Sequence, residues 1–309
     1  MAPILLFVYK RLETTKKVVS FLLKNELAEN SKIFIFSDGS KNDLDYNKVK
    51  EVRKFIRNIK GFKEIEIIER NKNYGLARSI IDGVTQIIND YGKVIVLEDD
   101  LITSPYFLKY MNEALEIYKN EERVGAICSN MYLVRKSLPE TFFLNFFDSW
   151  GWGTWKDKWE LFNSNALELL KEIKDKKLEK DFDFNNSYFF TQLLELQSLG
   201  IVNSWAIRWQ ASLFLSNKLC LFPQKSLVKN IGFEKEGSNT KTSLGGIVFT
   251  SNFDKGNNFI KVEKINVEEN LEAKQIVVAY FKQLKIRIIV KMMKVRNYLK
   301  ILKKKLIKK

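Results

Sequence analysis

Short apolar runs alternate with amphipathic segments over the first hundred residues of the chain. Apolar or alternating runs predict strands at 3–9, 32–40, 64–70 and 93–97. Apolar residues at helical spacing predict helices at 12–25, 49–59 and 75–92. This β-α-β-α order predicts an α/β fold with a mostly parallel sheet, in which ligands bind outside the carboxyl ends of the strands.

The pattern is less regular after residue 100. We expect a helix at 105–120, a strand at 124–129, helical structure at 185–217, and strand, turn, strand and loop at 218–240. An aromatic and glycine-rich segment lies at 146–162, and a Gly-, Ser- and Asn-rich segment at 234–258 is expected to be a mobile loop. We expect one α/β domain over 1–265, with halves 1–130 and 131–265, followed by a helical tail over 266–309.

The amino-acid composition removes several kinds of chemistry. The chain has no histidine, which excludes Ser-His-Asp and Cys-His catalysis and His-ligated zinc. Its two cysteines, Cys128 and Cys220, are expected to be free buried thiols of a cytosolic protein. No apolar run approaches the ~18 residues of a membrane span. The apolar start lacks a basic leader and a cleavage site, so we interpret it as the first strand.

The net charge of +15 is concentrated at one end of the chain. Residues 282–309 hold 12 Lys and Arg and no acid, whereas the rest holds 40 basic and 37 acidic residues. Apolar residues recur there at helical spacing, so a basic amphipathic helix is predicted. An anionic membrane surface is the partner that we favour. Packing on the body or on a second subunit, as in an oligomer, stays open, and nucleic acid is the least favoured because no recognition motif is present.

An acidic triplet, Glu98, Asp99 and Asp100, follows the fourth predicted strand. One interpretation is a solvated turn in which Asp100 or Thr103 caps the next helix. The other is a site for Mn²⁺ or Mg²⁺, which needs only one or two carboxylates when a diphosphate supplies further oxygens.

Polar residues also follow the other predicted strands. Lys10 and Arg11 could bind phosphate, and Asp38 lies in a turn with Gly39. Asn73 could cap the next helix, where Gly75 would let the backbone approach a ligand. Each position also has an ordinary structural explanation: a surface charge, an Asx turn or a helix cap.

The segment SWGWGTW carries three tryptophans, Trp150, Trp152 and Trp155, which could stack on sugar rings. Tryptophans are also common in protein cores. The intervening glycines, including Gly151, favour exposure because Gly-Trp-Gly is a poor helix interior.

Six segments in this order resemble the GT-A glycosyltransferases, with the closest likeness to the N-acetylglucosaminyltransferase I family and related bacterial transferases. The likeness covers roughly residues 2–240. It rests on APILLFVYKR, FSDGS, NYGLARSIIDGV, LEDD, SWGWGTW and FPQKSLVKNIGFEKEGSNT.

The resemblance implies a GT-A fold that binds a nucleotide-diphosphate sugar, expected to be a UDP-sugar, with Asp100 as the metal ligand. It implies nucleotide and cofactor contacts from Lys10, Arg11, Asp38, Asn73, Gly75, Glu98 and Asp99. It also implies sugar or acceptor contacts from Trp150, Gly151, Trp152, Trp205 and Arg208.

Two positions depart from the family pattern. The aspartate that serves as the base in an inverting mechanism is expected in SWAIRW, where this chain has Ala206. A histidine expected in the last loop is matched by Asn239. Replacement bases are sought among the carboxylates of nearby segments. We rank Asp157 first and Asp148 second, with Glu234 and Glu236 as further candidates. The alternative interpretation of Asp157, which we favour, is a solvated helix charge between Lys156 and Lys158.

The expected function is metal-dependent transfer of a sugar to a hydroxyl of a lipid-linked, lipopolysaccharide or capsule-type glycan. Inversion at the anomeric carbon is implied by the family resemblance alone, and Ala206 weakens that inference. We expect the protein on the inner face of the cytoplasmic membrane, without a nucleic-acid partner. The alternative is a catalytically degenerate subunit that binds nucleotide sugars or glycans within a membrane-associated assembly. A nucleotidyltransferase would carry a glycine- and arginine-rich loop after the first strand, which KRLETTKK does not supply.

Overall fold

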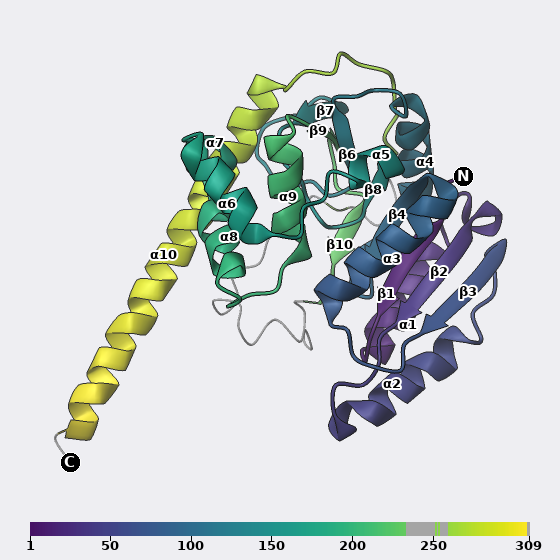
Figure 1. Ribbon diagram of the computed structural model, residues 1–309, viewed down its shortest axis with the longest axis horizontal. Coiled ribbons are helices and arrows are strands. Elements are labelled where there is room, and N and C mark those ends of the chain that lie inside the picture. The colour runs from purple at the N-terminus through teal and green to yellow at the C-terminus, as the bar shows by residue number, and fades with distance from the viewer. Residues whose placement is uncertain (233–250, 252, 254–258, 308–309) are drawn as a thin grey trace.

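The computed structural model describes residues 1–232, 251, 253 and 259–307, with side chains up to Lys291. Its centre is a mixed sheet in the strand order β3-β2-β1-β4-β8-β6-β9-β7 (Figure 1). Its strands are β1 (Ile4–Val8), β2 (Lys32–Ser37), β3 (Glu64–Glu69), β4 (Lys93–Glu98), β6 (Val124–Cys128), β7 (Thr141–Leu144), β8 (Trp152–Trp155) and β9 (Leu219–Pro223). The first four strands along the chain are mutually parallel, as the sequence predicts.

Helices cover both faces of the sheet. They are α1 (Leu12–Leu22), α2 (Asp43–Ile56), α3 (Leu76–Tyr91), α4 (Phe107–Ile117), α5 (Lys156–Trp159), α6 (Ala166–Asp175), α7 (Glu179–Phe182), α8 (Phe190–Ser198), α9 (Trp205–Leu215) and α10 (Leu271–Ile307). Side chains of β1 alternate between the two faces of the sheet, so this strand contacts the helices on both sides. Leu5 and Phe7 join the apolar core with α3, whereas Leu6 and Val8 join the core with α1, α2 and α4.

The strand order reverses direction between β1 and β4. The chain runs outward from β1 to β2 and β3, then returns to place β4 on the other side of β1. Such a switch point leaves a crevice outside the carboxyl ends of the two central strands. Lys10 and Arg11 follow β1 and the acidic triplet follows β4, so the residues singled out from the sequence flank this crevice.

A small antiparallel pair, β5 (Leu101–Thr103) with β10 (Val228–Asn230), lies beside the main sheet. Strand β5 begins directly after Asp100, so the acidic triplet forms a tight connection between two strands. The interpretation in which Asp100 or Thr103 caps the next helix is wrong, because α4 begins at Phe107 with Tyr106 at its N-cap. The pairing of β10 with β5 brings a distant loop over the acids.

Helix α10 begins on the body and ends away from it (Figure 1). Asn270 caps it, accepting a hydrogen bond from the Ala273 N–H at 2.9 Å. Val277, Phe281 and Leu284 are buried in the same apolar core as α6, α8 and α9. The first half of the predicted basic tail is therefore packed as part of the body, which was one of the alternatives left open by the sequence.

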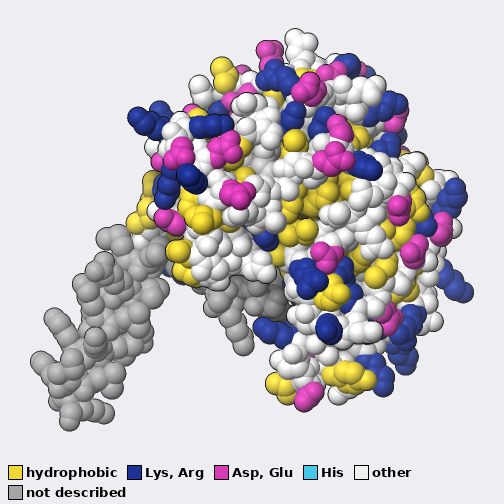
Figure 2. Space-filling view, viewed as in Figure 1, with side chains coloured by type: hydrophobic (Ala, Val, Ile, Leu, Met, Phe, Trp, Pro, Cys, Tyr) yellow, Lys and Arg dark blue, Asp and Glu magenta, His cyan; other side chains and the backbone are white. Residues whose placement is uncertain are grey.

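The remaining surface features agree with the charge distribution in the sequence. Figure 2 shows basic and acidic side chains interspersed over the described surface of this face, as the near balance of charge outside the tail predicts.

Cys128 and Cys220 are free and buried, as predicted. No helix in the described part of the chain holds a stretch long and apolar enough to cross a membrane.

Candidate functional site

A cavity of about 520 Å³ opens at the switch point between β1 and β4. We call it the larger cavity. Its lining includes ten of the residues singled out from the sequence, namely Lys10, Arg11, Asp38, Asn73, Gly75, Glu98, Asp99, Asp100, Trp150 and Trp205. Several chain segments that are far apart in sequence therefore contribute polar groups to one concave surface, which is the usual form of a small-molecule site.

Arg11 lies between two of the acids. Its Nη2 donates to Asp99 Oδ1 and, at 3.0 Å, to Asp100 Oδ2, while its Nε donates to Asp99 Oδ2 at 3.3 Å. Burial opposes the charge of Arg11, but the Asp99 and Asp100 carboxylates outweigh that effect and raise its pKa above the usual range. Arg11 is therefore fixed as a cation, and the bidentate contact with Asp99 orients it.

Glu98 and Asp100 are less stabilised in their charged forms than solvated carboxylates. Burial, and next the charges of Asp100 and Asp99, raise the pKa of Glu98 above its usual range. Burial likewise raises the pKa of Asp100, against the opposing effect of Arg11. Asp100 Oδ1 is buried without a hydrogen-bond partner in the described part of the chain. A buried carboxylate oxygen without a partner costs free energy, so the cluster favours an additional cation.

A divalent cation bound partly by a diphosphate fits this donor set. Among the described residues, no group of three or more acids or thiols forms a complete protein cage for a metal ion. Mg²⁺ and Mn²⁺ do not need one, since one or two carboxylates suffice when phosphate oxygens and water complete the shell. Asp100 would hold such an ion through the free Oδ1.

The backbone at Gly232 presses against the acid cluster. A Cβ at this position would lie 2.5 Å from Asp100 Oδ2 and 3.0 Å from Arg11 Nη1, so any other residue would displace these two side chains from their present positions. The Ile231 N–H donates to the Asp100 carbonyl at 2.8 Å, and the Gly232 N–H donates to Asn230 Oδ1 at 2.8 Å. Sequence reasoning noted this segment only as a closing strand and loop. A glycine directly after the predicted strand was the available signal.

Asp38 joins the end of β2 to the start of α3. Its two oxygens accept hydrogen bonds from the N–H groups of Gly39, Tyr74 and Gly75 at 2.8–2.9 Å and from Asn73 Nδ2 at 3.0 Å. Asn73 is therefore bound to Asp38 and to the Gly39 carbonyl, and it does not cap α3. The N-cap is Gly75, whose φ of 74° favours glycine. Asp38 thus orders the loop along one wall of the larger cavity.

Lys10 lies at the rim of the same cavity. Its Nζ contacts Asp45 Oδ1 at 2.8 Å, and the Tyr9 hydroxyl donates to Asp45 Oδ2 at 2.9 Å. These two contacts link the end of β1 to the first turn of α2, and they hold the positive charge of Lys10 near the larger cavity.

The tryptophans of the glycine-rich segment differ in exposure. Trp150 is half-buried and lines the larger cavity. Trp152 is fully buried and Trp155 is 5% exposed, so their expected exposure is wrong. Gly151 is also buried. Trp152 stacks on Trp205 with ring centroids 5.2 Å apart, and it lines neither this cavity nor its neighbour.

Arg208 does not line the larger cavity. Its guanidinium donates to the Ser204 and Ser164 carbonyls and to Asn203 Oδ1 at 3.1–3.3 Å, and burial lowers its pKa. Asn203 and Ser204 themselves line the cavity, so Arg208 orders that wall from outside.

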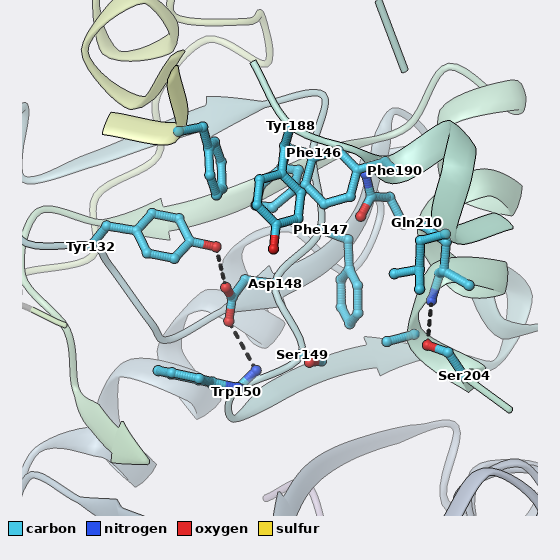
Figure 3. Close-up of a pocket in the computed structure, with 14 residues that line it drawn as sticks. Tyr132, Phe146, Phe147, Asp148, Ser149, Trp150, Tyr188, Phe190, Ser204 and Gln210 are labelled. Atoms are coloured by element: carbon cyan, nitrogen blue, oxygen red, sulfur yellow. Dashed lines mark hydrogen bonds between the residues drawn. The ribbon is translucent and has the colours of Figure 1, made fainter. Parts of the chain in front are cut away.

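A second cavity, of about 270 Å³, adjoins the first and is called the smaller cavity (Figure 3). Both cavities share Ser149, Trp150, Ser204 and Ala206 in their linings. Ala206, where the family resemblance led us to expect a base, thus lies at the junction. Asn239, Glu234 and Glu236 lie outside the described residues.

Asp148 is the acid in the lining of the smaller cavity. It is 8% exposed and accepts hydrogen bonds from the Tyr132 hydroxyl at 2.5 Å, the Trp150 N–H at 2.9 Å and Asn130 Nδ2 at 3.2 Å. Burial raises the pKa of Asp148, and these three hydrogen bonds oppose the rise. The result is a carboxylate that is more basic than a solvated one.

Asp157, ranked first as the replacement base, is on the wrong edge of the sheet. Strand β8 runs antiparallel to β4 and pairs Trp155 with Lys93, at the end of β4 opposite Glu98. The length of β4 therefore separates the two ends by roughly 16 Å. The Asp157 side chain is 60% exposed and contacts Lys158 at 2.6 Å. It is a surface ion pair, as the alternative interpretation of Asp157 predicts, and the assignment of Asp157 as the base is wrong.

Comparison with known proteins identifies one family and several distant structures. The profile of glycosyl transferase family 2 matches residues 4–175, more than half of the chain. No curated protein sequence matches.

Two of the similar solved structures are a mannosyltransferase and TarS. The mannosyltransferase PcManGT from Pyrobaculum calidifontis, in complex with GDP-Man and Mn²⁺, is 9% identical over 70% of this chain and 74% of its own, with a TM-score of 0.38. TarS from S. aureus is 13% identical over 76% of this chain and 37% of its own, with a TM-score of 0.41.

Proposed function

Because this chain belongs to glycosyl transferase family 2 and is a nucleotide-sugar glycosyltransferase of the GT-A fold, we propose that it transfers a hexosyl or N-acetylhexosaminyl group from a UDP-sugar to a glycan hydroxyl with inversion. The acid cluster at the switch point carries the proposal. Asp100 has a buried oxygen without a described partner, and Arg11 is held beside it. That arrangement suits a diphosphate with its cation.

The donor would lie in the larger cavity. Asp100 would hold Mn²⁺ or Mg²⁺, with Asp99 and Glu98 nearby in the same lining. A bound divalent cation would offset the charge that develops on the departing diphosphate. Arg11 and Lys10 would attract the phosphates, and the loop ordered by Asp38 would contact the nucleoside. Trp150 and Trp205 would support the sugar ring at the inner end of the cavity.

We also propose that the acceptor is a lipid-linked or lipopolysaccharide-type glycan and that α10 brings the enzyme to an anionic membrane surface. Ile286, Ile289 and Val290 are 41–60% exposed on the part of α10 whose side chains are described. Eight basic residues and no acid follow within 292–309. Exposed apolar residues beside basic ones suit a helix that lies in a membrane interface.

Calorimetry with UDP, in the presence and absence of Mn²⁺, tests the donor site. We expect Mn²⁺-dependent UDP binding that Asp100→Ala abolishes and that Asp157→Ala, at the opposite edge of the sheet, leaves unchanged. Incubation with UDP-sugars and Mn²⁺ should give slow UDP release into water, also lost in Asp100→Ala. Mn²⁺-independent binding, or equal binding by both variants, would contradict the assignment of Asp100.

Ala206 favours a second candidate, a subunit that binds nucleotide sugars without turnover. A general base contributes roughly 10²–10⁴ in rate, so a chain without one could retain binding alone. UDP-sugar binding without UDP release, across donors and acceptors, would support this candidate over the enzyme.

A further inference from the structure

The smaller cavity adjoins the proposed donor site and has an aromatic lining. Four residues are common to both cavities, so a molecule in one can reach a molecule in the other. Its aromatic residues come from distant parts of the chain and are Tyr132, Phe146, Phe147, Trp150, Tyr188, Phe190 and Phe281. Flat, apolar walls of this kind suit the C–H faces of a sugar ring.

Gln210 and Asp148 add polar groups to the apolar lining, together with Ser149 and Ser204. The Gln210 side chain points into the cavity (Figure 3), and the residue is 7% exposed. Asp148 presents its carboxylate to the same space. Since a buried amide and a buried carboxylate both favour hydrogen-bond partners, the cavity suits a ligand with hydroxyl groups better than a hydrocarbon chain.

Helix α10 packs against Tyr132, the residue whose hydroxyl donates a hydrogen bond to Asp148. The Tyr132 ring stacks on Tyr280 with centroids 5.0 Å apart, and Phe281 meets it edge-on at 5.0 Å. The Tyr132 hydroxyl donates to Asp148 Oδ2. Phe281 also lines the cavity itself. The first half of α10 therefore completes the cavity and sets the position of Tyr132.

We propose that the smaller cavity is the acceptor subsite, that it binds a pyranose ring, and that Asp148, positioned by Tyr132 beneath α10, accepts the proton of the attacking hydroxyl. This inference rests on the proposed function. The acceptor oxygen forms a bond to the anomeric carbon of the donor sugar, and the bond from that carbon to the diphosphate oxygen breaks. The electron pair leaves with UDP, and the hydroxyl proton moves to the Asp148 carboxylate.

The location of Asp148 explains how the chain can work with Ala206. Both residues line the smaller cavity, and Ala206 lies where the two cavities meet. A small side chain at the junction leaves room for the acceptor hydroxyl to approach the donor sugar. In this chain the carboxylate that accepts the proton is Asp148, in the segment before Trp150. In the family pattern it would come from position 206, in helix α9.

Binding of simple glycosides to the full chain tests the subsite. The probes are methyl and p-nitrophenyl hexopyranosides and N-acetylhexosaminides, measured by saturation-transfer NMR with UDP and Mn²⁺ present. We expect saturation of ring protons, and for Gln210→Leu, which has nearly the same shape, a loss of affinity on the order of tenfold. UDP affinity should stay unchanged in Gln210→Leu.

The role of Asp148 is tested by transfer to the best of these glycosides. We expect Asp148→Asn to lower kcat by ~10²–10⁴ with UDP binding intact, while the surface variant Asp157→Asn matches wild type. Tyr132→Phe keeps the ring stack but removes one hydrogen bond that opposes protonation of Asp148. It should lower kcat with little change in KM and move the acid limb of the kcat profile to higher pH, which a purely structural role would not do.

Among the described residues, the titratable groups that contact Asp148 are Tyr132 and Cys128, whose Sγ accepts the Asp148 N–H at 3.5 Å. The outcomes separate this inference from the proposed function. If UDP binds with Mn²⁺ but no glycoside binds, or Asp148→Asn transfers as fast as wild type, the acceptor subsite is wrong and the donor site stands. If UDP fails to bind, the proposed function fails, and with it the transfer step assigned here.

Discussion

Asp148 is a buried acid whose pKa is raised in the folded protein, mainly by burial. The folded state therefore holds the proton to a higher pH than the unfolded chain does. Its stabilising contribution is present below about pH 4 and is lost as pH rises through the folded pKa. We predict that wild type loses stability relative to Asp148→Asn across this interval, by about 1.4 kcal/mol for each pKa unit of difference.

Urea unfolding of both proteins between pH 3.5 and pH 8 would measure this difference. The comparison isolates Asp148 because Glu98 and the other acids are common to both chains. A stability difference that does not change with pH would show that the pKa of Asp148 is the same in the folded and unfolded states.

The sequence proposed both Asp148 and Asp157 as bases. It could not separate them, because what distinguishes them is the edge of the sheet that each one reaches.

The loop between β2 and α2 packs tightly on the loop before α3. A Cβ on Gly39 would lie 2.5 Å from the Lys72 carbonyl carbon and 2.6 Å from its oxygen, both backbone atoms that cannot rotate away. We predict that Gly39→Ala separates the two loops, lowers stability by about 1–3 kcal/mol and weakens UDP binding.

Gly200→Ala is the matched control for Gly39→Ala. Gly200 has a φ of 68° and open space around its Cβ position, so alanine there brings backbone strain of about 1–2 kcal/mol without a clash. Thermal unfolding and UDP titration of both variants would test the argument. If UDP affinity fell equally in both, general destabilisation would explain the loss, and the loop would have no specific role.

Helix α10 has an inner half that is part of the folded body. A chain ending at residue 270 loses Val277, Phe281 and Leu284, which are at most 3% exposed. Since removal of one buried Phe costs about 3–5 kcal/mol, we predict loss of cooperative unfolding or aggregation. A chain ending at Lys291 should keep the melting temperature of the full chain within a few degrees, as measured by circular dichroism. Equal melting of both truncated chains would contradict this packing.

At the scale of elements, the sequence predicted the helices and strands that depend on local patterns of apolar residues. The four parallel strands and α1 to α4 follow from apolar periodicity. The start of α2 was predicted too late, at 49, because its cap lies further upstream: Asn42 Oδ1 accepts the Asp45 N–H at 3.1 Å. Strand β5 was missed because its three residues become a strand only by pairing with β10.

At the scale of the whole molecule, the site could be predicted only in part. The polar residues after β1, β2 and β4 meet because parallel strands end at one edge, a rule that needs no coordinates. No comparable rule predicts the smaller cavity from the sequence. Its lining comes from segments between Tyr132 and Phe281, and α10 reaches it only through long-range packing. Trp152 shows the same limit, because its burial depends on Trp205 from another segment.

The outer half of α10 concentrates the charge of the molecule away from its nearly neutral body. Residues 292–309 carry eight basic residues and no acid. With about 1 kcal/mol for each basic residue near an anionic surface, they could contribute several kcal/mol to membrane binding. We predict that the full chain sediments with vesicles containing 30% phosphatidylserine and that the chain ending at Lys291 stays in the supernatant.

The charge and the apolar face of α10 can be separated in the same assay. Replacing Lys303, Lys304 and Lys305 with glutamine keeps the length and removes three charges, so we expect weaker sedimentation with phosphatidylserine vesicles. Binding should also fall as salt rises, because salt screens the attraction between basic residues and an anionic surface. Sedimentation of the chain ending at Lys291 to the same extent as the full chain, or equal binding to pure phosphatidylcholine, would contradict a role for the basic end. Since Phe281 and Tyr280 join the inner half of α10 to the smaller cavity, membrane contact through the outer half would orient that cavity toward acceptors at the surface.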